Sequence, residues 1–238
     1  MEWGDRVVVI TGATGGLGKE VVKTFLGAGA HVVFTYRNEA KLEALLSDLQ
    51  SFKTQLDYFK TNLTEEPSVQ ELARKTVEKH KKIDGLVNLV GGFAGGETIS
   101  ETTQENWDFL MNLNLKSVFL SSKAVVSYMI NQKYGKIVNV SSKAAVQRKA
   151  KAGPYSVSKA GVITFTQTLA DEVKGDNINV NAILPSIIAT EANIKRMPAK
   201  DHSRWVTPRE IAEVVLFLTS EGAGGINGAA IPVFGKLL

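Results

Sequence analysis

Several residue types and patterns are missing from this chain of 238 residues, and each absence excludes a class of protein. There is no cysteine, which excludes disulfide frameworks and thiolate metal sites. The three histidines, His31, His80 and His202, lack metal-ligand spacing, so no metal is expected. No apolar run approaches the roughly 18 residues of a membrane helix. No long basic block with interleaved aromatics indicates binding to nucleic acid.

The N-terminus and the overall composition add two further expectations. The chain enters a strand-like segment at once, without the basic and apolar regions of a signal peptide. Lys and Arg number 28 against 24 Asp and Glu, a net charge of +4, and the charge is scattered. Hydrophobic residues at 44% and charged residues at 22% are ordinary values for a globular protein. We therefore expect a cytoplasmic protein with ample material for a core and with neither a membrane nor a nucleic-acid partner.

Short apolar, β-branched runs alternate with helical patterns along the whole chain. Buried strands are predicted at residues 6–11, 31–36, 54–60, 84–90, 135–141, 178–184 and 230–233. Helices are predicted at residues 19–30, 39–50, 65–82, 103–131, 155–173 and 207–220, with a short helix or loop at 190–206. The alternation predicts a single α/β domain over residues 1–238. Its Rossmann-type, doubly wound parallel sheet would have about seven strands flanked by helices on both faces.

A glycine-rich turn follows the first predicted strand directly. Gly12, Gly16 and Gly18 stand between this strand and the first helix. Glycines at this place let the backbone approach a pyrophosphate, and the helix N-terminus offers free N–H groups. The spacing T-G-x-x-x-G-x-G differs from G-x-G-x-x-G, and a tight turn alone would also explain it. The context of strand, turn and helix favours nucleotide binding.

The end of the second strand bears on the choice of nucleotide. An acidic residue about 20 positions past the glycines would accept hydrogen bonds from the ribose of NAD. Here the residues are Thr35, Tyr36 and Arg37, with no carboxylate among them. A guanidinium suits a 2′-phosphate, so the sequence favours NADP(H) over NAD(H). The alternative is that Arg37 merely opens a solvated loop.

The stretch from Ser142 to Lys159 contains the groups best suited to proton transfer. Tyr155 and Lys159 are four residues apart, which places them on one face of a helix. A free phenol titrates near pH ~10, and a nearby ammonium would lower that pKa. Ser142, at the end of a predicted strand, would add a hydroxyl. Together these groups suit the transfer of a proton to or from a carbonyl oxygen, with the nucleotide as the source of electrons.

Two asparagines interrupt the longest helical pattern. Asn112 and Asn114 stand among apolar residues in the middle of residues 103–131. Asparagine is unfavourable inside a helix. One of the two is therefore expected to break the helical backbone or to bond to something specific.

With these features the chain resembles the short-chain dehydrogenase/reductases over essentially its whole length. The matching elements are TGATGGLG near the start, Asn114 seven residues after Trp107, Ser142, the Tyr155-x-x-x-Lys159 pair, and VNAILPS followed by Thr190. The resemblance implies an NADP(H)-dependent enzyme that interconverts a carbonyl and an alcohol of a small molecule. It also implies a homodimer or homotetramer that packs through the long helices near residues 103 and 155.

The resemblance implies a role for each matched residue. Tyr155 would be the general acid for reduction and the base for oxidation. Lys159 would hold the nicotinamide ribose and lower the pKa of the phenol. Ser142 would bond the substrate carbonyl, and Asn114 would position Lys159 through a water molecule. The implied cofactor-binding residues are Gly12, Thr14, Gly16, Leu17, Gly18, Arg37, Asn62, Leu63, Asn88, Gly91, Tyr155, Lys159, Pro185, Ile188 and Thr190.

Departures from the family pattern leave the substrate open. The usual Asn-Asn-Ala-Gly is here Asn88-Leu89-Val90-Gly91, so a sheet-bracing asparagine is expected to be lost. Residues 184–205, LPSIIATEANIKRMPAKDHSRW, resemble the dihydropteridine-reductase-like branch, although Ser142 is generally absent there. The alternatives are a dihydropteridine-reductase-like enzyme, a ketoacyl-thioester reductase, and a cofactor-binding regulatory protein without turnover.

Two groups of residues near the expected entrance each admit two interpretations. Basic residues between Ser142 and Tyr155 would attract an acidic carrier or anionic substrate, or would form a solvated loop. They are Lys143, Arg148, Lys149 and Lys151. Three aromatic residues would line a substrate pocket or belong to the core, and Trp205 is favoured over the other two for the pocket. They are Phe93, Trp107 and Trp205.

Overall fold

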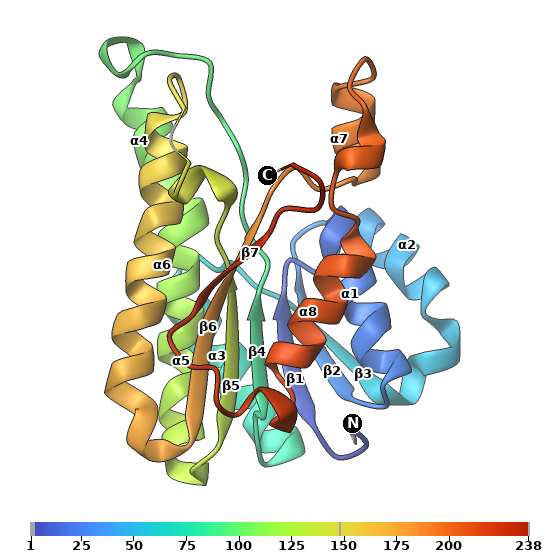
Figure 1. The fold of residues 1–238 in the computed structure, drawn as a ribbon. Coiled ribbons are helices and arrows are strands. Elements are labelled where there is room, and N and C mark those ends of the chain that lie inside the picture. Colours follow the sequence, from blue (N-terminus) through green and yellow to red (C-terminus); the bar gives the residue numbers. More distant parts are fainter. Residues whose placement is uncertain (1–2, 148, 238) are drawn as a thin grey trace.

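A parallel sheet of seven strands forms the centre of the fold (Figure 1). The computed structural model describes residues 3–147 and 149–237. The strands are β1 (Val7–Thr11), β2 (His31–Tyr36), β3 (Leu56–Lys60), β4 (Gly85–Asn88), β5 (Gly135–Val140), β6 (Ile178–Pro185) and β7 (Ala230–Val233). Their order in space is β3-β2-β1-β4-β5-β6-β7, and all neighbours pair in parallel. The Rossmann-type fold predicted from the alternation of strands and helices is confirmed.

Helices cover both faces of this sheet. One face packs against α1 (Gly16–Gly27), α2 (Glu39–Asp48) and α8 (Pro208–Leu218), and the other against α3 (Glu66–His80), α5 (Ser117–Gln132) and α6 (Gly153–Val173). In β1, Val8 and Ile10 contribute to the first core, whereas Val7 and Val9 contribute to the second. Because successive side chains point to opposite faces, a strand covered on both sides is apolar throughout.

The long helix predicted over residues 103–131 is divided into two. α4 (Gln104–Met111) leads into a π-helical segment, Asn112–Lys116, and α5 follows. Asn114 is fully buried within that segment. A π-helical turn re-aims side chains within an otherwise continuous helix and often marks a functional site. The expected break at an asparagine is confirmed.

The carboxyl ends of the strands form the functional end of the molecule. Strand order reverses between β1 and β4, which opens a crevice where open α/β sheets bind ligands. Figure 1 shows α4 and the short α7 (Glu191–Arg196) above this end, on opposite sides of the crevice. Among the described residues, no helix combines the length and apolar character that crossing a membrane requires.

Candidate active site

The glycine turn is packed too tightly for any side chain at its helix end. A Cβ atom on Gly18 would collide with the carbonyl oxygen of Gly12 and the backbone of Ala13. Gly12 itself has a φ of +72°, in the region that favours glycine. α1 begins at Gly16 with no acidic residue in its first turn, so its free N–H groups face the crevice without a competing charge. This geometry fits a pyrophosphate.

A cleft of about 250 Å³ runs from the end of β2 across the glycine turn to the loop after β4. Its lining residues are Gly12, Thr14, Gly15, Thr35, Tyr36, Arg37, Lys41, Thr61, Asn62, Leu63, Thr64, Leu89, Val90, Gly91, Leu113 and Ser117. The fold therefore brings together Gly12, Thr14, Arg37, Asn62, Leu63 and Gly91, all expected to bind the cofactor. A larger hollow, about 450 Å³, lies between α3 and α5 and contains none of the predicted site residues.

Lys41 is a cleft residue that the sequence patterns did not reveal. Asn38 caps α2 by accepting a hydrogen bond from the Lys41 N–H at 3.0 Å. This cap fixes Lys41 in the first turn of α2, and its side chain lines the same cleft as Arg37. The spacing of four between Arg37 and Lys41 was the available signal. Two cations at the end of β2 suit a doubly charged phosphate.

Tyr155 lies near the start of α6, with its ring half-buried beneath Phe93. The two rings meet edge to face, with centroids 5.0 Å apart. Burial raises the pKa of the Tyr155 phenol above its ordinary value, and a hydrogen bond with Ser142 partly opposes that rise. Ser142 comes directly after β5, and its Oγ accepts from the Ala144 N–H at 3.2 Å. The phenol therefore keeps its proton at neutral pH and is poised as an acid.

Lys159, one turn further along α6, is almost completely buried. Its ammonium donates to the carbonyl oxygen of Val140 at 2.8 Å. Burial lowers the pKa of Lys159 to about 8. Burial is the largest influence on the pKa of the Tyr155 phenol, and the Lys159 ammonium is bonded to β5. That Lys159 lowers the pKa of Tyr155 therefore stays a prediction.

Asn114 fastens the loop after β4 to α6. Its Oδ1 accepts from the Gly92 N–H at 2.8 Å, and its Nδ2 donates to the Gly92 carbonyl at 3.0 Å and to Ser158 Oγ at 3.1 Å. A Cβ atom on Gly91 would lie 2.9 Å from Lys159 Nζ and 3.0 Å from Asn114 Oδ1. Gly91 thus lies between the cleft and the buried lysine. A side chain at this position would crowd both Lys159 Nζ and Asn114 Oδ1.

Asn88 lies apart from the cleft lining. It is opposite Asn139 in the register of β4 and β5, and its Nδ2 donates to Asn139 Oδ1 at 2.9 Å. Asn139 Nδ2 in turn donates to Thr166 of α6 at 2.9 Å. The structure therefore gives Asn88, which was expected to bind the cofactor, a bracing position between strands.

Three further predicted cofactor residues, Pro185, Ile188 and Thr190, lie at the opposite wall of the crevice. Pro185 ends β6, and Ile188 forms a bridge with Val206. Thr190 caps α7 by accepting from the Asn193 N–H, and its side chain lies against Gly16. Leu17 is half-buried against the core on the α1 face. The segment from Pro185 to Thr190 is thus held over the glycine turn.

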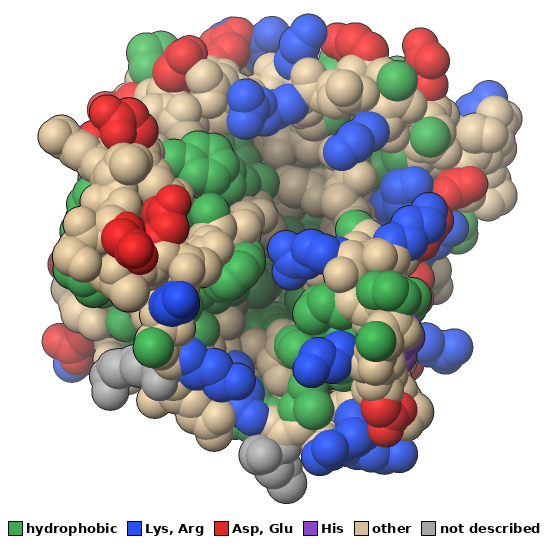
Figure 2. All heavy atoms as spheres, turned by 90° about the horizontal axis from the view of Figure 1, so that it is seen from above, with side chains coloured by type: hydrophobic (Ala, Val, Ile, Leu, Met, Phe, Trp, Pro, Cys, Tyr) green, Lys and Arg blue, Asp and Glu red, His purple; other side chains and the backbone are tan. Residues whose placement is uncertain are grey.

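The exposed aromatic residue at the site is Phe93, whereas the sequence favoured Trp205. Trp205, which was favoured for a pocket, is 6% exposed and therefore buried. Phe93 is 51% exposed and touches the catalytic tyrosine candidate. Arg196 of α7 lies with its guanidinium carbon 5.7 Å from the centroid of the Phe93 ring. Seen from above, the molecule is hollowed at its centre, with hydrophobic walls and several Lys and Arg side chains on the rim (Figure 2).

The cleft reaches Gly91, which packs against the buried Lys159, and Lys159 is one helical turn from Tyr155. A cleft with a glycine turn beside a tyrosine and a lysine suits a nucleotide-dependent oxidoreductase. Comparisons with known proteins agree. The family model described as short chain dehydrogenase matches residues 6–201. A 3-oxoacyl-[acyl-carrier-protein] reductase from Thermotoga maritima is 35% identical, with 98% of each chain covered. An NAD-dependent glycerol dehydrogenase from Listeria innocua is 34% identical, with 97% of this chain and 93% of the relative covered.

Solved structures give the same result. A short-chain type dehydrogenase/reductase from Mycobacterium ulcerans has a TM-score of 0.94 and 26% identity, covering 100% of this chain and 91% of its own. A structure described as ElxO with NADP bound has a TM-score of 0.92 and 26% identity, with 98% of each chain covered. The chain belongs to the short-chain dehydrogenase/reductase family, and it is an NAD(P)-dependent oxidoreductase acting on a carbonyl/alcohol pair.

Proposed function

We propose that the protein reduces a carbonyl with NADPH and that Tyr155 donates the proton. The observation that carries this proposal is the placement of Tyr155 on α6, one turn before the buried Lys159, with Ser142 directly after β5. When bound, the cofactor supplies the hydride. Tyr155 gives its proton to the carbonyl oxygen, and the Ser142 hydroxyl stabilises the charge that develops there. Lys159, charged below pH about 8, stabilises the phenolate left behind.

The preference for NADP(H) over NAD(H) is supported by charge at the end of β2. Arg37 and Lys41 both line the cleft there, and Thr35, Tyr36 and Arg37 offer no carboxylate to the ribose. The relatives include an NAD-dependent enzyme and an NADP-bound structure, so the preference rests on these two cations of this chain.

A β-ketoacyl thioester is the substrate class that we favour. A relative with 35% identity is described as a 3-oxoacyl-[acyl-carrier-protein] reductase, and Lys149 and Lys151 are exposed near the start of α6. Lys143 is less free than its neighbours, because it bonds the Leu237 carbonyl and lies over the Phe234 ring. Arg148, the fourth basic residue, lies outside the described residues. The dihydropteridine alternative rests on residues 184–205 alone.

A substrate screen with the wild type and one variant tests this function. The protein is mixed with NADPH or NADH and a panel that includes a β-keto thioester, quinonoid dihydropterin and simple ketones. We expect NADPH oxidation with the thioester, and its loss in Tyr155→Phe, which should still bind NADPH. Tight NADPH binding without turnover on any carbonyl would favour the regulatory alternative. Full activity in Tyr155→Phe would exclude Tyr155 as the acid.

Charge reversal tests whether the basic residues attract an acidic carrier. Lys149→Glu and Lys151→Glu should lower kcat/KM for a carrier-linked thioester and weaken its dependence on ionic strength. A short uncharged thioester should be unaffected. Lys174→Glu is the matched control, because Lys174 is an exposed cation just beyond the far end of α6. Equal effects of all three substitutions would contradict steering by this loop.

We also propose that copies of the chain assemble through α5 and α6 as a dimer or tetramer. Phe119 on α5 and Val157 on α6 are large apolar side chains that stand 42% and 49% exposed. Phe119 pairs edge to face with Phe165 of α6, so an apolar strip crosses both helices. Light scattering should give a mass above one chain for the wild type, and Phe119→Asp should shift it toward the monomer.

We also propose that the protein is located in the cytoplasm, which cell fractionation tests.

A further inference from the structure

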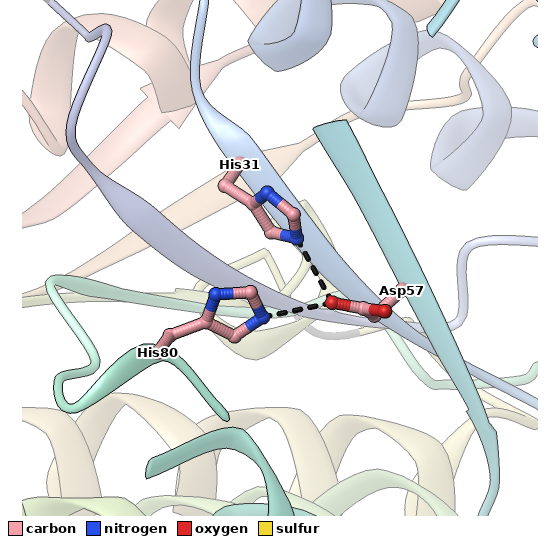
Figure 3. A group of neighbouring side chains, drawn as sticks. All are labelled: His31, Asp57 and His80. Atoms are coloured by element: carbon pink, nitrogen blue, oxygen red, sulfur yellow. Dashed lines mark hydrogen bonds and ion pairs between the residues drawn. The ribbon is translucent and has the colours of Figure 1, made fainter. Parts of the chain in front are cut away.

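Two histidines and one aspartate meet at the edge of the sheet far from the cleft. His31 Nε2 and His80 Nε2 lie 2.9 Å and 2.8 Å from the same oxygen, Asp57 Oδ2. Figure 3 shows the three side chains pointing toward one another from three different elements. All three ligand atoms lie within 4.8 Å of one another. We call these residues the His31–Asp57–His80 cluster.

The sheet register explains why these residues meet. His31 begins β2, and Asp57 of β3 lies opposite Val33, two residues further along β2. Alternation places His31 and Val33 on the same face, so His31 and Asp57 are diagonal neighbours. That face is covered by α3, whose last residue is His80. Three elements thus supply one side chain each.

The chemical state of the cluster suits a metal ion. Asp57 Oδ2 lies within hydrogen-bond distance of Nε2 of both histidines, and Lys79 bonds the other carboxylate oxygen. Among residues 3–147 and 149–237, no group forms a hydrogen bond to Nδ1 of His31 or His80. Each Nε2–H can donate to Asp57 without an ion. When an ion replaces these bonds, the proton can move to Nδ1, and Nε2 becomes a ligand.

The geometry allows an ion to enter with small movements. Zn²⁺ takes nitrogen and oxygen ligands at about 2.0–2.2 Å, so the present separations need to open by only about 0.5 Å. The side chains of His31, Asp57 and His80 are 22%, 17% and 13% exposed, which leaves a path for the ion and for water as a fourth ligand. Lys79 bonds the other carboxylate oxygen, Oδ1, and so orients Oδ2 toward the rings.

We propose that the His31–Asp57–His80 cluster is a zinc-binding site that ties β2, β3 and the end of α3 together. The site has three protein ligands of the kind Zn²⁺ accepts, and the chain has no cysteine to compete for the ion. It lies at the opposite end of β2 from Arg37, about 20 Å away along the strand. The ion would therefore stabilise the edge of the sheet without entering the reaction.

Calorimetric titration of tag-free, EDTA-stripped protein with ZnCl₂ tests this site. We expect one ion per chain and a rise in the melting temperature with added Zn²⁺, because the ion binds only the folded arrangement. His31→Ala and His80→Ala should each weaken binding by at least about tenfold. His202→Ala is the matched control, since it removes the third histidine, which lies outside the cluster, and it should bind as the wild type does.

NMR of the wild-type protein tests the site without any variant, so the result does not depend on whether a variant folds. Histidine-selective NMR of the wild type should show the ring signals of His31 and His80 moving with Zn²⁺ while those of His202 stay in place. Co²⁺ should bind at the same site and give the visible bands of a tetrahedral ion. Three results would overturn the proposal: no binding at tens of micromolar Zn²⁺, unchanged affinity in His31→Ala and His80→Ala, or shifts only at His202.

Discussion

The ammonium of Lys159 is bonded to the Val140 carbonyl oxygen at 2.8 Å, so the buried charge of α6 is held by the last residue of β5. Val140 is two residues before Ser142, and Tyr155 is one helical turn before Lys159. The same strand end and the same helix turn therefore position all three groups. Burial lowers the pKa of Lys159 and raises that of Tyr155, so the lysine loses its proton first as the pH rises.

The activity should fall above pH about 8 as Lys159 loses its charge. Its ammonium stabilises the phenolate formed when Tyr155 gives up a proton, and only the protonated lysine can do this. Tyr155 keeps its own proton across this range, because burial raises its pKa. In the direction of reduction, kcat/KM with respect to NADPH should be level below this pH and decline above it.

Lys159→Arg provides the control for this profile. A guanidinium stays charged at all accessible pH values, so the decline should vanish even if the rate is lower throughout. A wild-type profile that stays level to pH 10, or an unchanged decline in Lys159→Arg, would show that another group is responsible.

Lys159→Met should abolish turnover and yet stabilise the protein. The pKa of Lys159 is lowered from 10.5 to about 8, so between these values the unfolded chain holds more protons, and the free energy of unfolding rises with pH. Below pH 8 the folded state holds a buried charge at a cost of about 3 kcal/mol. Loss of the bond to Val140 offsets about 1 kcal/mol of the gain. Thermal melts at pH 7 and at pH 10.5 check this, with the gain expected at pH 7 and absent at the higher pH.

The fold and most of the cleft could be predicted because their causes are local. A strand buried on both faces is apolar throughout, as in β1, and a glycine turn between strand and helix is visible in the sequence. The pairing of Asn88 with Asn139 could not be predicted, because it depends on the register of β4 against β5. The meeting of His31 and His80 likewise requires β2 to lie beside β3 with the end of α3 packed against them. To predict that Lys41 lines the cleft, one would have to know where α2 begins.

Replacing Gly91 with alanine should damage the site without unfolding the protein. The new Cβ atom would lie 2.9 Å from Lys159 Nζ and 3.0 Å from Asn114 Oδ1, so one of these groups has to move. Displacement of a positioned group by about 1 Å can cost on the order of 100-fold in rate, and we expect a loss of kcat/KM of that size. Gly27→Ala is the control: nothing lies within 4 Å of its added Cβ, and activity should not change. Equal activity of the two variants would contradict the close packing around Gly91.

Arg37→Ala should weaken the binding of NADPH far more than that of NADH. A charged hydrogen bond contributes about 1.5–3 kcal/mol, which corresponds to a rise in Kd of about 10- to 100-fold for the phosphorylated cofactor. Lys41→Ala should act in the same direction with a smaller effect, because an ammonium binds a phosphate without the paired donors of a guanidinium. The affinity for NADH, which has no 2′-phosphate, should change little in either variant.

Fluorescence titration with both cofactors measures these affinities. Lys53→Ala, outside the cleft lining, is the matched control and should leave both cofactors bound as in the wild type. Raising the salt concentration should reduce the NADPH preference of the wild type more than that of Arg37→Ala, because screening acts on the charge that the variant lacks. Equal losses for NADPH and NADH in Arg37→Ala would mean that Arg37 supports the shape of the cleft and does not bind the phosphate.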